Sequence, residues 1–341
     1  MNIKYLAYNL FKTDYKKLNE YIKKLSKERK IKKINIIKDL IVCLFKYNTR
    51  FLDYFYFKFF NPEVVREKHT NVWDMYVFHN KYNSKNSVIL RNKLLFRERY
   101  NKFFNYPYFK LDSINKLNEL IQWIILHNIE KLVAKEPMGT VGKGVEILKI
   151  ENRNGNRFIN NQQIDSFLKT KFEEGFTLYE TFIEQDEVLA NIYPHSINTI
   201  RVVTFLNNEN RVEIWGALLR VGYDKKVDNF DAGGLSARIN LDNGIVETSA
   251  KIKDPFVSDT FIKHPITGAL IKGVKIPFWE EVLDLVTNSA LEIKDVRTVG
   301  WDVAISKSGP TLIEGNDNWD KTHFELISEI GLNSRIKQLI K

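Results

Sequence analysis

Two carboxylates and an amide near the C-terminal end of the sequence form a pattern that suits a hard metal ion. Asp302 lies within the apolar segment 300–305, and Glu314 and Asn316 lie in a second segment that follows a Ser-Gly-Pro turn. Both segments have strand character, so we predict a hairpin. Charges inside apolar strands are costly unless they are paired or bound to a metal, and ligands that are all oxygen indicate Mg²⁺. Because Mg²⁺ is usually shared with substrate phosphates, the pattern also predicts a nucleotide.

A second segment, residues 131–150, has the composition of a phosphate-binding hairpin. Residues 131–137 and 145–150 are predicted strands, and the loop between them contains Gly139, Gly142, Lys143 and Gly144. Glycines permit a positive φ and let backbone amides approach an anion closely. Lys135, on the strand that precedes the loop, could neutralise the charge of a bound phosphate. The Walker pattern and the pattern G-x-G-x-x-G are both missing, which disfavours P-loop, Rossmann and protein-kinase folds. The alternative is a plain hairpin.

The order of these segments resembles that of the ATP-grasp superfamily, and within it the sugar-transfer associated ATP-grasp proteins of bacterial polysaccharide biosynthesis. The resemblance covers about residues 92–319 and rests on residues 198–204, residues 227–234, and Gly300–Asp302 paired with Glu314–Asn316. It implies an α+β ATP-grasp fold in which two α+β subdomains clasp ATP and Mg²⁺. It also implies a reaction in which a carboxylate is activated as an acylphosphate before an amine attacks it.

The resemblance assigns roles to residues around the nucleotide. Lys135 would touch a phosphate, Glu180 would accept a hydrogen bond from the adenine amino group, and Glu187 would reach the ribose hydroxyls. The implied nucleotide-binding set is Lys93, Lys135, Gly139, Gly142, Lys143, Gly144, Glu180, Phe182, Ile183, Gln185 and Glu187. The implied ligands of the Mg²⁺ ions that bridge the β- and γ-phosphates are Asp302, Glu314 and Asn316.

These assignments have plain structural alternatives. Glu180 and Glu187 could be solvated acids on an edge strand. Lys93 could belong to a solvated helix face together with Arg97–Arg99, and Asn92 replaces the Asp that commonly precedes this lysine in the superfamily.

Three further residues are candidates for catalysis: Arg201, Arg220 and Asn229. The arginines lie in apolar, strand-like surroundings, where a planar guanidinium suits a γ-phosphate or a substrate carboxylate. Structural pairing with an acid is the alternative. Asn229 lies in a loop whose glycine pair offers amides to an oxyanion, and a simple turn is its alternative. For His195 and His264, both in predicted loops, a turn role is favoured over that of a base.

Composition limits the class of protein. With 341 residues and 44% hydrophobic content, the chain can bury a substantial core and should form two or more subdomains. Cys43 is the only cysteine, which excludes an intramolecular disulfide and a Cys-based zinc site and fits a reducing cytoplasm. No apolar stretch approaches the ~20 residues of a membrane span, and the first residues lack a secretory signal. We therefore expect a cytoplasmic protein.

Positive charge is concentrated in residues 1–50. This segment contains 14 Lys or Arg and 4 Asp or Glu, so its net charge equals the +10 of the whole chain. Aliphatic residues recur in it at helical spacing: Ile31, Ile34, Ile37, Leu40, Ile41, Leu44 and Phe45. The favoured interpretation is a helical cap whose apolar face packs on the body. The alternative is peripheral contact with an anionic membrane, at its inner face. Nucleic-acid binding is disfavoured, because no recognisable nucleic-acid module accompanies the segment.

The sequence predicts four parts and two clear helices. The parts are a basic, aromatic-rich helical extension (1–60), a small mixed region that contributes Lys93 (61–125), a first ATP-grasp subdomain with the glycine loop and hinge (126–190), and a second with the metal site (191–341). The helices are expected near residues 162–172 and 278–293.

The resemblance implies an ATP- and Mg²⁺-dependent carboxylate–amine ligase. It would join an amino acid or another amine to a sugar carboxylate in the construction of capsule or other surface polysaccharide. Its partners would be the carboxylate and amine substrates. Two alternatives are a sugar kinase that uses the same nucleotide grip and a nucleotide-binding scaffold without turnover.

Overall fold

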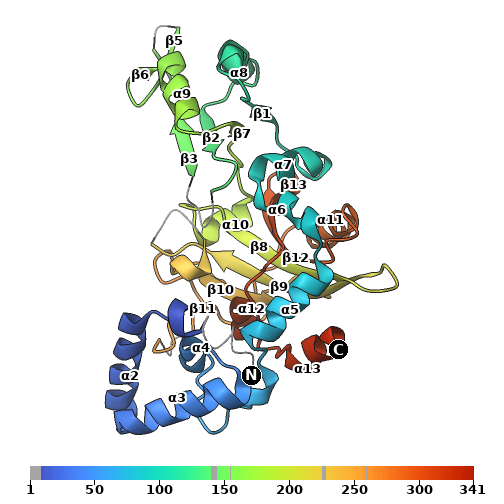
Figure 1. The fold of residues 1–341 in the computed structure, drawn as a ribbon. Helices are drawn as coiled ribbons and strands as arrows, with labels where there is room; N and C mark the ends of the chain where they lie inside the picture. The colour runs from blue at the N-terminus through green and yellow to red at the C-terminus, as the bar shows by residue number, and fades with distance from the viewer. Residues whose placement is uncertain (1–8, 140–143, 154, 225–227, 258–259) are drawn as a thin grey trace.

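A six-stranded antiparallel sheet is the largest unit of the protein (Figure 1). The computed structural model describes residues 9–139, 144–153, 155–224, 228–257 and 260–341. The strand order of the sheet is β11-β10-β9-β8-β12-β13. The strands are β8 (Thr199–Leu206), β9 (Val212–Val221), β10 (Leu235–Ile239), β11 (Lys251–Ile252), β12 (Thr298–Ser306) and β13 (Gly309–Asn316). Its central strands are apolar along most of their length because both faces of the sheet are covered.

The two faces of this sheet pack against different helices. Ile200 and Val202 of β8 share a core with α11 (Trp279–Leu291). Val203 and Phe205 share another core with α5 (Val72–Tyr82), α12 (Lys321–Ser328) and α13 (Asn333–Ile340). Side chains alternate along a strand, so Arg201 points to the second face. This face carries the candidate site.

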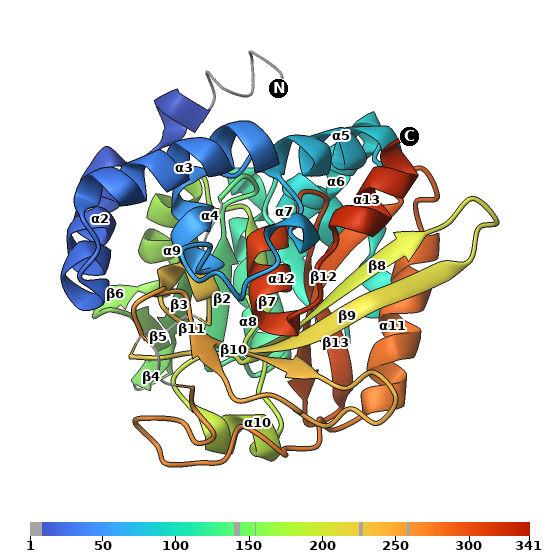
Figure 2. The same cartoon turned by 90° about the horizontal axis from the view of Figure 1, so that it is seen from below.

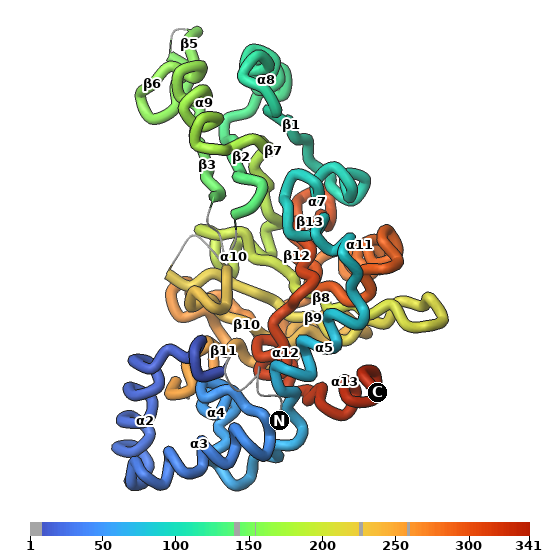
Figure 3. Tube along the Cα trace, in the orientation of Figure 1, coloured from blue at the N-terminus to red at the C-terminus, as the bar shows by residue number. Residues whose placement is uncertain are grey.

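A second sheet, of four strands, lies at the top of the molecule in Figures 1 and 3. Its antiparallel strands, in spatial order, are β1 (Tyr108–Lys110), β7 (Leu178–Thr181), β2 (Lys131–Lys135) and β3 (Val145–Lys149). Buried apolar residues of α8 (Leu117–Leu126) and α9 (Ile164–Glu173) share its core. A three-stranded sheet follows β3, with β4 (Glu151–Arg153), β5 (Asn156–Ile159) and β6 (Gln162–Gln163). The predicted β2–β3 hairpin therefore forms, and α9 and α11 confirm the two predicted helices.

The N-terminal extension is helical, as predicted, and forms an edge of the molecule in Figure 2. It contains α2 (Tyr15–Arg29), α3 (Lys33–Tyr47) and α4 (Phe51–Tyr56). Their buried face forms a core that includes Phe55 and reaches Phe256 and Leu326 of the body. Asp53 adds a buried ion cluster, because it accepts hydrogen bonds from Arg50 (2.9 Å) and from Lys321 on α12 (2.9 Å). The extension therefore caps the body, which agrees with the favoured interpretation.

Short elements connect these units. The remaining helices are α6 (Val88–Arg91), α7 (Lys93–Arg99) and α10 (Glu187–Ile192), with 3₁₀ turns at Arg66–Lys68, Lys85–Ser87, Asn101–Phe103, Ile114–Lys116 and Phe230–Ala232. In the described part of the chain, no helix combines the length and the apolar character needed to cross a bilayer. The mixture of helices and antiparallel sheets confirms the predicted α+β class.

Candidate active site

The predicted acidic hairpin forms, and it brings its three polar residues together. Asp302 on β12 lies directly opposite Glu314 on β13. A β-bulge follows this pair, in which Ile313 is the extra residue. Asn316 is two residues beyond Glu314 and donates a hydrogen bond from Nδ2 to Glu314 Oε1 (3.2 Å). The side chains proposed as metal ligands are thus neighbours on one face of the hairpin.

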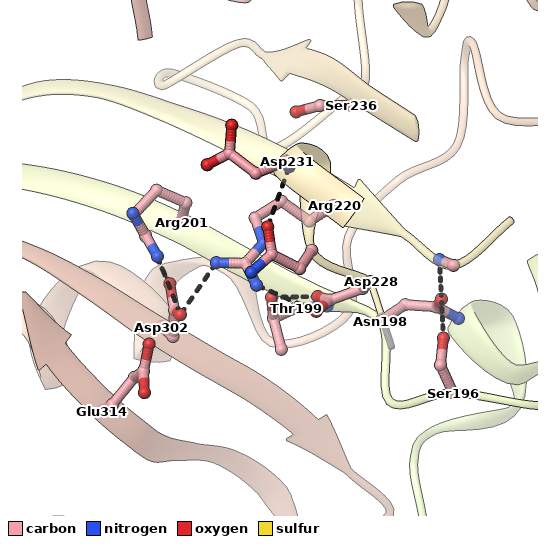
Figure 4. A network of polar contacts seen from close by, with 12 residues as sticks. Ser196, Asn198, Thr199, Arg201, Arg220, Asp228, Asp231, Ser236, Asp302 and Glu314 are labelled. Carbon is pink, nitrogen blue, oxygen red and sulfur yellow. Dashed lines mark hydrogen bonds and ion pairs between the residues drawn. The ribbon is translucent and has the colours of Figure 1, made fainter. Parts of the chain in front are cut away.

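Two arginines hold Asp302, one from the adjacent strand β8 and one from β9, the next strand of the sheet (Figure 4). Arg201 lies opposite Asp302 in the β8–β12 register and forms a two-point pair, with Nη2 2.9 Å from Oδ2 and Nε in contact with Oδ1. Arg220 on β9 donates from Nη1 to Asp302 Oδ2 (2.8 Å) and from Nη2 to Asp228 Oδ1 (2.9 Å). Both arginines are therefore paired with acids and lie beside the acidic hairpin.

Burial makes the charge balance of this cluster important. Burial would raise the pKa of Asp302, but Arg201 and Arg220 outweigh it and hold that pKa well below its usual range. Burial and the neighbouring Asp302 carboxylate both raise the pKa of Glu314. Three carboxylates, including that of Asp228, face two guanidinium groups, so the fully ionised cluster has one uncompensated negative charge. A divalent cation would relieve this excess, so the donor set fits Mg²⁺.

The proposed metal site depends on oxygen donors of mixed type. Across the described residues, no group of three or more His, Cys, Asp or Glu side chains is arranged to hold a metal ion. The hairpin contributes two acids and one amide, and the coordination that Mg²⁺ still lacks is usually completed by water and substrate phosphates.

The two ends of the glycine loop lie close together at the edge of the upper sheet. Glu136 N donates to Gly144 O (2.8 Å), which continues the pairing of β2 with β3. Gly144 has a φ of +67°, and a Cβ there would lie 2.9 Å from the Glu136 side chain, so the position requires glycine. Gly139 is described, whereas Gly142 and Lys143 lie outside the described residues.

Lys93 connects the glycine loop to the acidic hairpin. Its backbone N donates to Pro137 O (2.8 Å), and its Nζ contacts Gly139 O. Burial lowers the pKa of Lys93, while the Glu314 carboxylate opposes this shift and the Lys135 ammonium adds to it. Lys93 is therefore within electrostatic reach of both the hairpin and the β2 lysine. Lys93 is partly buried, which disagrees with the solvated helix face, and its role as a phosphate ligand stays a prediction.

Glu180 is buried and ion-paired through both carboxylate oxygens. Its Oε2 lies 2.5 Å from Lys135 Nζ, and its Oε1 lies 3.1 Å from Arg97 Nε. The Arg97 guanidinium is also buried, 3.9 Å from the centre of the Phe104 ring and 4.4 Å from that of Tyr108. The alternative of a solvated edge acid is thus wrong for Glu180, because β7 is an inner strand. Each oxygen keeps a second lone pair, so the contact with an adenine amino group stays a prediction.

The hinge between the two sheets borders a cavity of about 340 Å³. The hinge residues Phe182, Ile183 and Glu184 line it together with residues around the β12–β13 turn and in the segment before β1: Asn105, Tyr106, Ser306, Lys307 and Ser308. Ser306 is four residues from Asp302 along β12, which corresponds to about 13 Å at roughly 3.3 Å per residue. The cavity therefore lies at the turn end of the hairpin, and the acidic pair lies about midway along β12.

The remaining two hinge candidates differ in how the protein already uses them. Gln185 donates from Nε2 to Ser196 O (2.9 Å) and accepts from Asn198 N (3.1 Å), so its amide fixes the start of the lower sheet. Glu187 is exposed at the first position of α10. Contacts of either side chain with a nucleotide stay predictions.

Asn229 and His264 shape turns. Asn229 Oδ1 accepts from Asp231 N (2.8 Å) and caps a 3₁₀ turn. His264 is buried, with Nε2 2.8 Å from Gly222 O, which agrees with the favoured turn role. His195 is exposed. The catalytic role of Asn229 stays a prediction.

A sequence profile of sugar-transfer associated ATP-grasp proteins matches residues 75–341, which is more than half of the chain. The chain belongs to the sugar-transfer associated ATP-grasp family. This membership confirms the predicted family, the ATP-grasp fold and the prediction of an ATP-grasp enzyme. No curated protein matches the chain.

Solved structures give remote similarities to this ATP-grasp protein. D-alanyl-alanine synthetase A from Vibrio cholerae has a TM-score of 0.45 and 11% identity, and the match covers 74% of this chain and 65% of that one. N5-carboxyaminoimidazole synthetase from Staphylococcus aureus, complexed with ADP, has a TM-score of 0.40 and 9% identity, and the match covers 70% of this chain and 47% of that one. A biotin carboxylase domain from Hydrogenobacter thermophilus, with MgADP and bicarbonate, has a TM-score of 0.44 and 14% identity, and the match covers 75% of this chain and 46% of that one. The chain thus spans between about half and two-thirds of their lengths, and the similarities say nothing about its substrates.

Sequence reasoning missed two members of the ATP-grasp site. The sequence offers Arg97 only as part of a possible solvated helix face, but its side chain lies among aromatic rings and pairs with Glu180. The closely spaced aromatic residues Phe104, Tyr106 and Tyr108 were the available signal, since arginine stacks well on aromatic rings. Asp228 was treated as part of a loop, and its carboxylate proves to be the second partner of a buried arginine.

Proposed function

We propose that the protein is an ATP- and Mg²⁺-dependent ligase that joins an amino acid or another amine to a sugar carboxylate in surface-polysaccharide biosynthesis. The observation that carries this proposal is the pair of the buried Asp302 and the half-buried Glu314, with Arg201 on one side and Lys93, which contacts the glycine loop, within electrostatic reach. Acidic metal ligands, a guanidinium and a phosphate-binding lysine are the groups that phosphoryl transfer requires. The family name supports a role associated with sugar transfer.

The arrangement suggests how ATP would lie. The hinge cavity beside Phe182 and Ile183 suits the adenine, and the acidic pair about 13 Å along β12 suits the end of the triphosphate. Lys93 and Lys135 would contact the phosphates between them. Asp302, Glu314 and Asn316 would hold Mg²⁺, which supplies charge neutralisation for the phosphate oxygens when it is bound.

The chain's own residues would then position the reacting groups. A carboxylate oxygen of the sugar attacks the γ-phosphorus, the bond to the bridging oxygen breaks, and ADP leaves. The amine nitrogen next attacks the acyl carbon, phosphate leaves with its electron pair, and the amine releases a proton. Arg201 and Arg220 would orient the carboxylate and offset its charge. Within the described residues, the buried Nε of Arg220 has no hydrogen-bond acceptor.

Trapping of the acylphosphate tests the proposal. The protein is incubated with ATP, Mg²⁺, hydroxylamine and a panel of uronic acids and amino acids, and products are weighed by mass spectrometry. A ligase should yield a hydroxamate even when the natural amine is missing. Arg201→Lys should reduce trapping more than ATP binding, because lysine loses the two-point geometry. Arg211→Lys, in the exposed β8–β9 turn, is the matched control and should not change it.

Two results would contradict a ligase. A stable phospho-sugar without hydroxamate would show that the acceptor is a hydroxyl and the enzyme a kinase. Tight ATP binding with no product from any member of the panel would support a scaffold without turnover.

A further inference from the structure

Helix α3 is apolar on both of its faces. Its inward residues, Ile36, Leu40, Cys43 and Leu44, are buried in the core of the extension. Its outward residues are between 39 and 57% exposed: Ile34, Ile37, Ile41, Val42 and Phe45. The prediction of one apolar face packed on the body therefore holds only for part of the run, because Ile34, Ile37, Ile41 and Phe45 stay exposed.

The outward residues form a continuous stripe. Ile34, Ile37, Ile41 and Phe45 follow one another at spacings of three, four and four residues, so their side chains lie in a row along the helix, and Lys38 lies beside this row. A helix on the surface of a soluble protein normally presents polar residues to water, and contiguous exposed apolar residues mark an interaction site. The packing of α3 onto the body thus accounts for one face and leaves the other to a partner.

The two helices of the extension that include the stripe, α2 and α3, are strongly basic on their exposed surface. Exposed basic residues on and between α2 and α3 are Lys16, Lys23, Lys24, Lys27, Arg29, Lys30, Lys32, Lys33, Lys38 and Lys46. The exposed acids in the same described stretch, residues 15–47, are Glu20 and Glu28. Asp39 does not reduce this excess much, since its carboxylate pairs with Arg66 (2.8 Å). The surface therefore fits a partner that is both apolar and anionic.

We propose that the outward face of α3 docks on an anionic lipid bilayer. The exposed Ile34, Ile41 and Phe45 side chains enter the boundary between headgroups and acyl chains, and the lysines extend to the lipid phosphates. A second copy of the chain fits less well, because a two-fold contact would place the same basic rim against itself. In Figure 1, α3 lies along the lower edge and the four-stranded sheet at the top, so docking leaves the nucleotide site uncovered.

Flotation of the full-length protein with vesicles tests this docking. Vesicles contain phosphatidylcholine alone or with phosphatidylglycerol, at low and at high salt. The stripe variant is Ile34→Gln with Phe45→Gln. Its matched control is Ile262→Gln with Ile266→Gln, at positions of equal exposure outside the extension (55 and 56%, against 55 and 57%). A charge variant replaces Lys33 and Lys38 with Gln. Unchanged melting temperature and ATP binding show that each variant is folded.

We expect wild type and control to bind only the anionic vesicles and to be released by high salt. The stripe variant should lose at least about tenfold in vesicle affinity, because two large apolar side chains no longer enter the interface. The charge variant should lose affinity at low salt. Three results overturn the proposal: wild type does not bind anionic vesicles at low salt, the stripe variant binds as well as its control, or the stripe variant abolishes a dimer seen by light scattering while vesicles play no part.

Discussion

The two acids of the hairpin look equivalent in the sequence, but the structure predicts that they have opposite effects on stability. Asp302 is buried and is the partner of two arginines, whereas Glu314 is a half-buried carboxylate next to another carboxylate. Asp302→Asn removes the counter-charge of Arg201 and part of that of Arg220. Glu314→Gln removes a repulsion and keeps the volume of the side chain. Both substitutions should abolish turnover, but only the first should weaken the fold.

The magnitude follows from these contacts. Removing one partner of a buried ion pair costs roughly 3–5 kcal/mol, because the opposite charge is left without compensation. Asp302→Asn should therefore lower the melting temperature by about 4–7 °C in a chain of this size. Glu314→Gln should leave the free energy of unfolding unchanged or increase it. The raised pKa of Glu314 shows that its ionised form is disfavoured in the folded state.

Thermal unfolding without nucleotide measures the stability difference, and ATP consumption with Mg²⁺ and the substrates measures turnover. Glu209→Gln, in the exposed β8–β9 turn, is the matched control and should change neither quantity. Equal losses of melting temperature in Asp302→Asn and Glu314→Gln would refute the assignment of Asp302 as the arginine partner. Turnover close to wild type in either variant would refute the role of the hairpin as metal ligand.

Three further predictions concern other groups. Burial would raise the pKa of Asp53, but Arg50 and Lys321 lower it to about 2. The stability that this ion cluster provides is therefore present above the pKa of the unfolded state, near 4, and is lost as pH falls from about 4 to 2. Acid unfolding followed by circular dichroism should show this loss of stability in the wild type and not in Asp53→Asn. Arg97→Lys should weaken ATP binding, measured by calorimetry, about tenfold, because Glu180 is then no longer held through both of its carboxylate oxygens. The substitution Arg99→Lys, at an exposed position, should leave ATP binding unchanged. Mg²⁺-dependent ATP affinity should fall as pH is lowered toward the raised pKa of Glu314, and Glu314→Gln should lose this dependence.

The parts of the site that lie within one hairpin could be predicted from the sequence. The strands of the acidic hairpin are short apolar segments joined by turn residues, and their pairing follows from local spacing alone. The β2–β3 hairpin and the position of Lys135 on it follow in the same way. The bulge at Ile313 could not be predicted, because the apolar pattern of the strand is similar in the register with the bulge and in the register without it.

The ion pairs that complete the site could not be predicted, because they join residues far apart in the chain. Arg201 and Asp302 are 101 positions apart, and Arg97 and Glu180 are 83 positions apart. The sequence shows that each side chain needs a partner if it is buried, but not which acid the fold brings to it. The same limit applies to α3, where helical spacing identifies the apolar residues but not the side that packs on the body.

The arginine cluster links stability to the proposed reaction. Arg201 is held by Asp302, so the guanidinium that would offset the charge of the reacting groups is already fixed before they arrive. When the ligands bind, Asp302 would replace part of its contact with Arg201 by a contact with Mg²⁺. Arg201 would replace its contact with Asp302 by contacts with phosphate or carboxylate oxygens. Each charged group would therefore keep a partner of opposite charge. Such an exchange avoids leaving a buried charge unpaired, which is the largest cost in a site of this kind. The pairing seen in the structure and the catalytic role predicted from the sequence are therefore compatible states of the same residues.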